Sequence, residues 1–241
     1  MTDDVAQDRT APGSGQRRML VVLGVIAALA VGFLLGFLAR IPFGDSQAAP
    51  AADSVDVGFS QDMTVHHNQA IELATIALTE SSDQRVKNLA YDILTTQQNQ
   101  VGQMQGWLAL WDRAPLPAGA YMTWMGEDGE HAHDGHDGHD GHGSDGHGSD
   151  DVGTGPMPGM ASSQDLTDLR AASGPELDVL FLQLMLRHHE GGLPMMEYGA
   201  EHAEVATVRT LAQTMVDTQT SESQLMTSML AERGAQPLPM N

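Results

Sequence analysis

The sequence of 241 residues contains no cysteine, so it can form no disulfide bond, no thiolate metal site and no thiol nucleophile. Basic residues are also scarce. There are 11 Lys and Arg against 32 Asp and Glu, which gives a formal net charge of −21. Because nucleic acids are bound by clustered Lys and Arg, we expect no nucleic-acid partner. The acidity is compatible with cations as ligands.

The Glu-x-x-His pattern, with which ferritin-like bundles hold iron or manganese, is missing from the apolar helical segments of the chain. No nucleophile–base pattern is found either, and both absences argue against an enzyme. The chain has instead 15 Met and 11 His. Thioethers favour copper, especially Cu(I), and imidazole suits several metals. Methionine is also ordinary core filler, so these counts alone assign no site.

One motif occurs twice, 122 residues apart. Asp56, Phe59, Met63, His66 and His67 return in the second copy as Asp178, Phe181, Met185, His188 and His189. The register continues without a gap to Pro115 and Pro237. Each copy is long enough for two helices, so the repeat predicts two similar helical hairpins.

The hairpins and the long connection between them predict an all-α fold, a ferritin-like four-helix bundle over residues 54–234. Its repeats cover residues 54–112 and 175–234. Residues 113–162 are rich in Pro, Gly, Asp and His and have no apolar periodicity, so we expect a disordered linker there. Residues 235–241 form a tail.

Residues 19–39 form an apolar run that is broken only by glycines. As a helix this run would be about 31 Å long, close to the roughly 30 Å of a bilayer core. We expect a single transmembrane helix, with residues 1–18 as a cytoplasmic tail and 40–53 as a tether. Arg17 and Arg18 favour an inside amino terminus, which would anchor an extracytoplasmic domain to the cytoplasmic membrane. Cleavage as a signal peptide is the alternative.

The paired histidines are predicted to face the interior of the bundle. At 100° per residue, Met63, His66 and His67 share a helix face about 100° wide with Phe59. The candidate metal ligands of the bundle are Met63, His66, His67, Met104, Met185, His188, His189, Glu222 and Met226. This set of Met and His favours a copper ion.

Three interpretations of the histidine pairs stay open at this stage. All four could bind metal, or all four could be hydrogen-bonded core residues. In the third, one His of each pair binds metal while its neighbour hydrogen-bonds across the bundle. Glu222 corresponds to Gln100 in the first copy, so the two halves need not be equivalent.

The linker holds a second group of candidate ligands, because Asp-Gly-His occurs there at residues 134–136, 137–139, 140–142 and 145–147. These ligands are His131, His133, His136, His139, His142 and His147. Such tracts bind Cu(II), zinc or nickel with little selectivity. A solvated acidic spacer is the alternative.

The doubled Asp-x-x-Phe-x-x-x-Met-x-x-His-His pattern, followed by Gln97 or Gln219 and by Met104 or Met226, resembles the family catalogued as domain of unknown function 305. The resemblance implies a ferritin-like four-helix fold and export from the cytoplasm. Some members are similar to periplasmic copper-binding proteins that use Met and His. Residues 191–194 depart from the usual continuation of the pattern.

The expected function is therefore copper sequestration or delivery by a membrane-anchored, extracytoplasmic protein. Its partners would be metal ions and the membrane, and a homo-oligomer or a complex with other metal-handling proteins is compatible with the sequence. A helical interaction module with structural histidines and a ferritin-like metal-dependent oxidoreductase are the alternatives.

Overall fold

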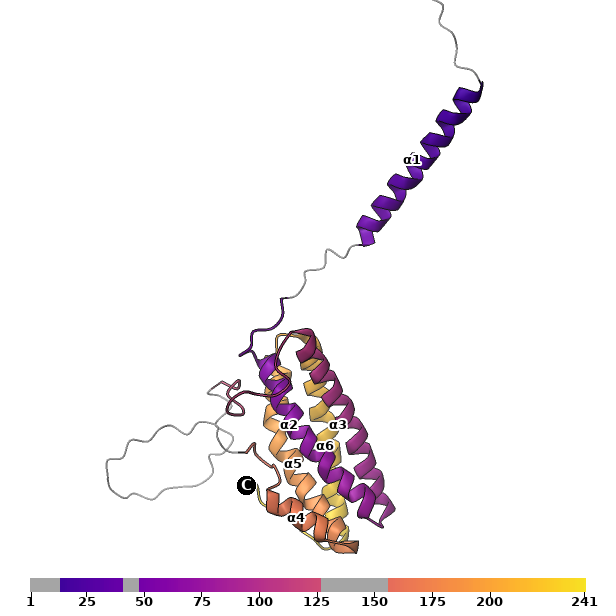
Figure 1. Ribbon diagram of the computed structural model, residues 1–241. Coiled ribbons are helices and arrows are strands. Elements are labelled where there is room, and N and C mark those ends of the chain that lie inside the picture. Colours follow the sequence, from indigo (N-terminus) through magenta and orange to yellow (C-terminus); the bar gives the residue numbers. More distant parts are fainter. Residues whose placement is uncertain (1–13, 41–47, 127–155) are drawn as a thin grey trace, which may run out of the picture. The chain divides into compact units, whose positions relative to one another are not determined.

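The computed structural model describes residues 14–40, 48–126 and 156–241, and it divides the chain into two compact units, Met1–Ala48 and Ala49–Asn241 (Figure 1). The first unit contains one helix, α1 (Ser14–Arg40). Within the described ranges, no helix is both long enough and apolar enough to cross a membrane. The transmembrane helix over residues 19–39 stays a prediction.

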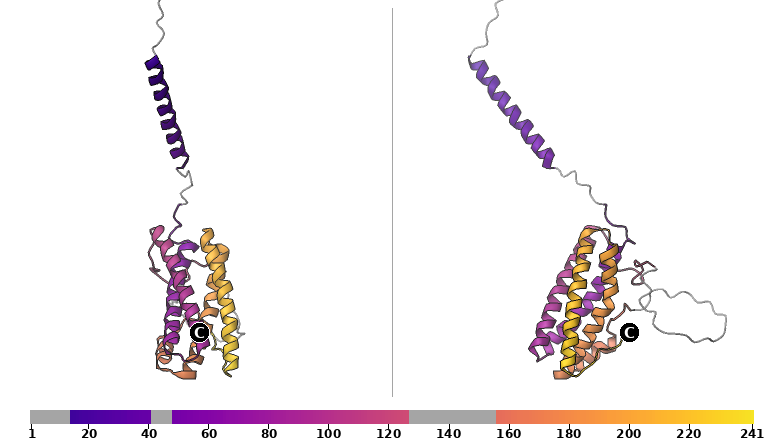
Figure 2. Two further views of the ribbon diagram at one scale, coloured as in Figure 1. Left: turned by 90° about the vertical axis from the view of Figure 1, so that its right-hand side faces the viewer. Right: turned by 180° about the vertical axis from the view of Figure 1, so that it is seen from behind.

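The second unit is built from four long helices and one short one (Figure 1). The long helices are α2 (Val55–Glu80), α3 (Gln84–Leu110), α5 (Gly174–His202) and α6 (Ala206–Glu232). The short α4 (Ser163–Ala171) lies across one end of the bundle, where it contacts α2 and α5 (Figures 1 and 2). The predicted all-α four-helix bundle is confirmed.

The two hairpins, α2 with α3 and α5 with α6, are joined chiefly by contact between α2 and α5. The repeated aspartates help to hold them together. Asp56 of α2 accepts hydrogen bonds from the backbone N–H groups of Glu204 (3.0 Å) and Val205 (2.8 Å), in the turn before α6. Asp178 of α5 accepts one from Ser81 Oγ (2.5 Å), in the turn before α3. Each copy of the motif thus closes the turn of the other copy.

The apolar core of the bundle has two parts. The α4-end cluster includes Phe181, Met185 and Met226 with many Leu and Ala side chains. The methionine cluster, at the other end, is much richer in sulfur. It contains the buried methionines Met63, Met104, Met125, Met157, Met195, Met196 and Met215. On α2 the His pair follows Met63 of the methionine cluster, and on α5 it follows Leu186 of the α4-end cluster. The His pairs therefore lie between the two clusters.

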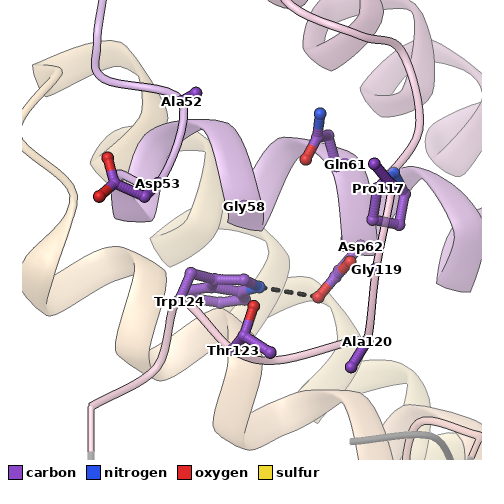
Figure 3. Close-up of a pocket in the computed structure, with 11 residues that line it drawn as sticks. Ala52, Asp53, Gly58, Gln61, Asp62, Pro117, Gly119, Ala120, Thr123 and Trp124 are labelled. Atoms are coloured by element: carbon purple, nitrogen blue, oxygen red, sulfur yellow. Dashed lines mark hydrogen bonds between the residues drawn. The ribbon is translucent and has the colours of Figure 1, made fainter.

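Residues 113–126 and 156–162, which we expected to belong to a disordered linker, pack on the bundle. Asp62 of α2 accepts hydrogen bonds from Met122 N (2.7 Å) and from the indole nitrogen of Trp124 (2.8 Å) (Figure 3). The Trp124 ring lies against Gly58, where any Cβ would be about 2.3 Å from it. Hydrogen bonds to Asp62 and the close approach of Trp124 to Gly58 therefore hold residues 122–124 against α2.

Candidate metal centre

Eight polar side chains from the four long helices form one layer between the two apolar clusters, which we call the polar layer. In the order of the helices they are His66, His67, Gln97, Gln100, His188, His189, Gln219 and Glu222. All eight are buried except Glu222, whose side chain is 14% exposed. They form four pairs related by the 122-residue repeat. The layer is thus a shared interior site with approximate twofold symmetry.

The outer histidines are held by the second helix of their own hairpin. His67 Nε2 lies 2.8 Å from Gln100 Oε1, and His189 Nε2 lies 2.7 Å from Glu222 Oε2. A carboxylate oxygen is an acceptor, so Nε2 of His189 is the donor in the second of these bonds. Neither Nδ1 atom has a hydrogen-bond partner among the described residues. These two rings are fixed at one nitrogen only.

The inner histidines meet each other across the α2–α5 contact. The ring centroids of His66 and His188 are 3.8 Å apart, with 39° between the ring planes. Both side chains are fully buried, and none of their four ring nitrogens makes a well-formed hydrogen bond within the described ranges. The closest approach to one is between the His66 ring and the backbone of Pro158, and between the His188 ring and the backbone of His66. Leaving one buried polar group unpaired costs about 1–3 kcal/mol, so such groups are rare in folded proteins. Their concentration here indicates a site that is built for a ligand.

Two buried amides add to the unpartnered groups of the layer. Gln97 and Gln219 are 2% and 3% exposed, and both side-chain atoms of each lack a hydrogen-bond partner in the part of the chain that the structure describes. Neither was among the candidate ligands predicted from the sequence. Their matched positions in the repeat and their place on the inward face are the signals that could have found them.

Burial also sets the charge of the histidines. It is the largest cause that lowers the pKa of His66 and His188 well below the ordinary 6.5, and the neighbouring imidazoles lower both further. Burial lowers the pKa of His67 to about 4, against the opposing effect of its hydrogen bond to Gln100. These three rings are therefore neutral at pH 7, which is the form that coordinates metals.

The four methionines of the predicted site do not gather around one point. Met63 and Met104 belong to the methionine cluster, and Met185 and Met226 belong to the α4-end cluster, so the polar layer separates the two pairs. All four are fully buried. The structure therefore brings together His66, His67, His188, His189 and Glu222, with one pair of thioethers on each side.

As placed, the described residues contain no group of three or more His, Asp or Glu side chains that could hold a metal ion. The inner rings are close and tilted by 39° to each other, and an ion held between their nitrogens would need the rings to move apart. A site of two imidazoles and one or two thioethers needs no such group of three, and it has the donor set that suits Cu(I). The six linker histidines lie outside the described residues.

A docked segment covers the inner histidines on the α2–α5 face. Gln69 of α2 binds both backbone groups of Ala161, with distances of 2.9 Å and 2.6 Å. The preceding backbone at Pro158 lies against Gly191, where a Cβ would come within 2.4 Å of the Pro158 carbonyl oxygen. A Cβ at Gly192 would lie 2.7 Å from the His66 ring. The unusual stretch at residues 191–194 thus makes room for the cover and for the imidazole, and α5 continues through Pro194.

Similar proteins support this reading of the fold. A DUF305 protein of Streptomyces coelicolor is 39% identical, with a TM-score of 0.65 over 78% of this chain and 99% of its own. A DUF305 fragment from Deinococcus radiodurans is 29% identical, with a TM-score of 0.55 over 74% of this chain and 96% of its own. CopM in its Cu(I)-bound form is 21% identical, with a TM-score of 0.52 over 73% and 96%, a likeness that establishes the fold alone.

None of the curated proteins matches the chain. The family model described as "Domain of unknown function (DUF305)" matches residues 56–230, which begin at the first repeated aspartate and end in α6. That range includes both histidine pairs and every member of the polar layer. The chain belongs to the DUF305 family.

Proposed function

We propose that this protein binds copper in the polar layer, with His66 and His188 as the imidazole ligands, and that it sequesters or delivers the ion. The observation that carries the proposal is the set of four ring nitrogens on these two residues, which are fully buried and make no well-formed hydrogen bond among the described residues. A bound ion would satisfy groups that otherwise destabilise the fold.

The outer histidines have a different role in this proposal. His67 and His189 are already hydrogen-bonded to Gln100 and Glu222, so one nitrogen of each is used to orient the ring. This arrangement favours the interpretation in which one His of each pair binds metal and its neighbour supports it. Glu222 gives the second half a carboxylate, which adds negative charge beside the site.

The donor set favours copper over other metals. Imidazole with thioether, in a chain without cysteine, suits Cu(I), and carboxylate ligands, which iron and manganese prefer, are reduced here to Glu222. Met63 and Met185 lie one helical turn before His66 and His188, close enough to share the ion. The structures of CopM with Cu(I) and with Cu(II) support this choice, since that protein shares the fold.

An extracytoplasmic location is part of the proposal. The Streptomyces coelicolor relative is described as a candidate secreted protein, and it matches this chain at 39% identity. In that location the six histidines of the linker would collect Cu(II), zinc or nickel ions near the bundle. Other metal-handling proteins would be the partners that supply or receive copper.

Titration of the full chain with Cu(I), in competition with a chromophoric chelator, tests the proposal. The six linker histidines are first replaced with alanine, so that uptake reports on the bundle. Replacing His66, His67, His188 and His189 with alanine is expected to weaken binding by about 100-fold or more, because the neutral imidazoles are lost as ligands. The matched control is His202→Ala, a half-exposed histidine at the end of α5, which should bind like the parent. Unchanged affinity in the four-histidine variant would refute the proposal.

A further inference from the structure

A pocket of about 410 Å³ opens between α5 and α6, beside the polar layer. The lining residues are polar except for Leu193, but most of the surface that they turn toward the pocket is apolar. The lining residues are His189, Glu190, Leu193, Gln219, Thr220, Ser223, Gln224 and Thr227. Two of these, His189 and Gln219, belong to the polar layer, and the others lie between that layer and the surface. The pocket therefore reaches two residues of the polar layer from the surface.

The inner end of the pocket carries groups that lack a partner. His189 Nδ1 and both side-chain atoms of Gln219 have no hydrogen-bond partner among the described residues, and both side chains are at least 97% buried. At the outer end, the side chain of Glu190 is exposed. A cation at the pocket would thus meet the Glu190 carboxylate near the surface, and the unpartnered atoms of His189 and Gln219 lie buried behind the lining.

The equivalent surface of the first hairpin is also largely polar, but it has a buried valine at the position of Ser223. Ser223 corresponds to Val101 and Leu193 corresponds to Ile71 in the 122-residue register. Val101 is only 4% exposed, and Ile71 packs with it in the methionine cluster. A small hydroxyl side chain at the position of a buried valine is the difference that leaves space between α5 and α6.

The remaining faces of the layer are also covered. The α2–α5 face lies under Pro158 and Gly159, whose backbone is in close contact with Gly191. A pocket of about 350 Å³ between α3 and α6 reaches Gln100, but the Gln100 amide is hydrogen-bonded to His67 and separates the pocket from that ring. Of the surfaces considered, the α5–α6 pocket is the one that touches a histidine.

We infer that metal ions enter and leave the polar layer through the α5–α6 pocket, past Glu190 and Ser223. The inference rests on the proposed copper function and adds the route of the ion to it. The ion passes through the second hairpin only, although the polar layer is nearly twofold symmetric. Ser223 acts here as a positioning residue, because it keeps the route open and need not touch the bound ion. A residue of this kind changes how fast the ion exchanges and leaves the affinity unchanged.

Stopped-flow mixing of the full chain with Cu(II), followed by quenching of tryptophan fluorescence, tests the inference. The linker histidines are again replaced with alanine in every variant. Ser223→Val, which installs the side chain found at Val101, is expected to slow both association and dissociation about tenfold and to leave Kd within about twofold. Ser223→Ala, which leaves the space open, should exchange the ion as fast as the parent.

The matched control fills the other pocket. Thr96→Leu adds a larger side chain to the α3–α6 pocket and should change neither rate. An unchanged association rate in Ser223→Val, or slowing by Thr96→Leu instead, would overturn the inference while the copper function stands. A loss of affinity in Ser223→Val without slower association would make Ser223 a ligand or a structural residue and would also overturn it. A parent protein that takes up no copper contradicts both proposals.

Discussion

Replacing both His66 and His188 with leucine is expected to stabilise the metal-free protein while abolishing copper binding in the bundle. The two rings carry four buried nitrogens that make no well-formed hydrogen bond among the described residues, beyond contacts with the backbone of Pro158 and of His66. Exchanging such groups for apolar ones of similar size removes their desolvation cost, which we put at about 2 kcal/mol or more for the pair. Urea unfolding of the metal-free variants would measure the gain, and Cu(I) titration the loss.

The outer pair provides the control, because it should respond in the opposite direction. Replacing His67 and His189 with leucine breaks the hydrogen bonds to Gln100 and Glu222 and leaves these two side chains without a partner inside the bundle. This variant should lose about 2–4 kcal/mol of stability. If the histidines were only structural, both double variants would be destabilised. A destabilised His66/His188 variant would therefore count against a ligand site.

Acidification should weaken the metal-free fold through its buried histidines. Burial lowers the pKa of His67 to about 4 in the folded protein, whereas the unfolded chain titrates near 6.5. Between these values the unfolded state binds more protons, so stability is retained above pH 6.5 and falls as the pH drops toward 4. His67 alone should account for about 2 kcal/mol between pH 7 and pH 5. The lowered pKa values of His66 and His188 act with the same sign.

The measurement is the free energy of unfolding of the parent and of His67→Leu at several pH values. The comparison is needed because protonation of the acidic side chains relieves repulsion in a chain with a net charge of −21. That effect is common to both proteins and cancels in their difference. The unfolding free energy of the parent minus that of His67→Leu should fall by about 2 kcal/mol from pH 7 to pH 5. A difference that is constant over this range would mean that His67 is not held neutral by the fold.

The repeat made the architecture of the bundle predictable. A 122-residue offset with inward-facing Met and His requires two similar hairpins that pack on each other, and the structure has them. The same periodicity could not distinguish His66 from His67, because adjacent residues fall on one broad inward face. Their different roles arise from contacts between hairpins, where His66 meets His188 and His67 meets Gln100. Such contacts depend on packing that no single helix encodes.

Other features were missed for the same reason. Gly192 belongs to the stretch that departs from the family pattern, and it leaves room for the His66 ring, which comes from another helix. Asp56 shares the inward stripe with Met63, yet it binds the turn before α6.

The central claim is that buried imidazoles of the polar layer hold the copper ion. X-ray absorption at the copper edge, on the Cu(I)-loaded full chain without linker histidines, tests it most directly. The account predicts the multiple-scattering signal of about two imidazoles together with sulfur from methionine. A coordination shell of sulfur or oxygen alone, without imidazole scattering, would contradict it.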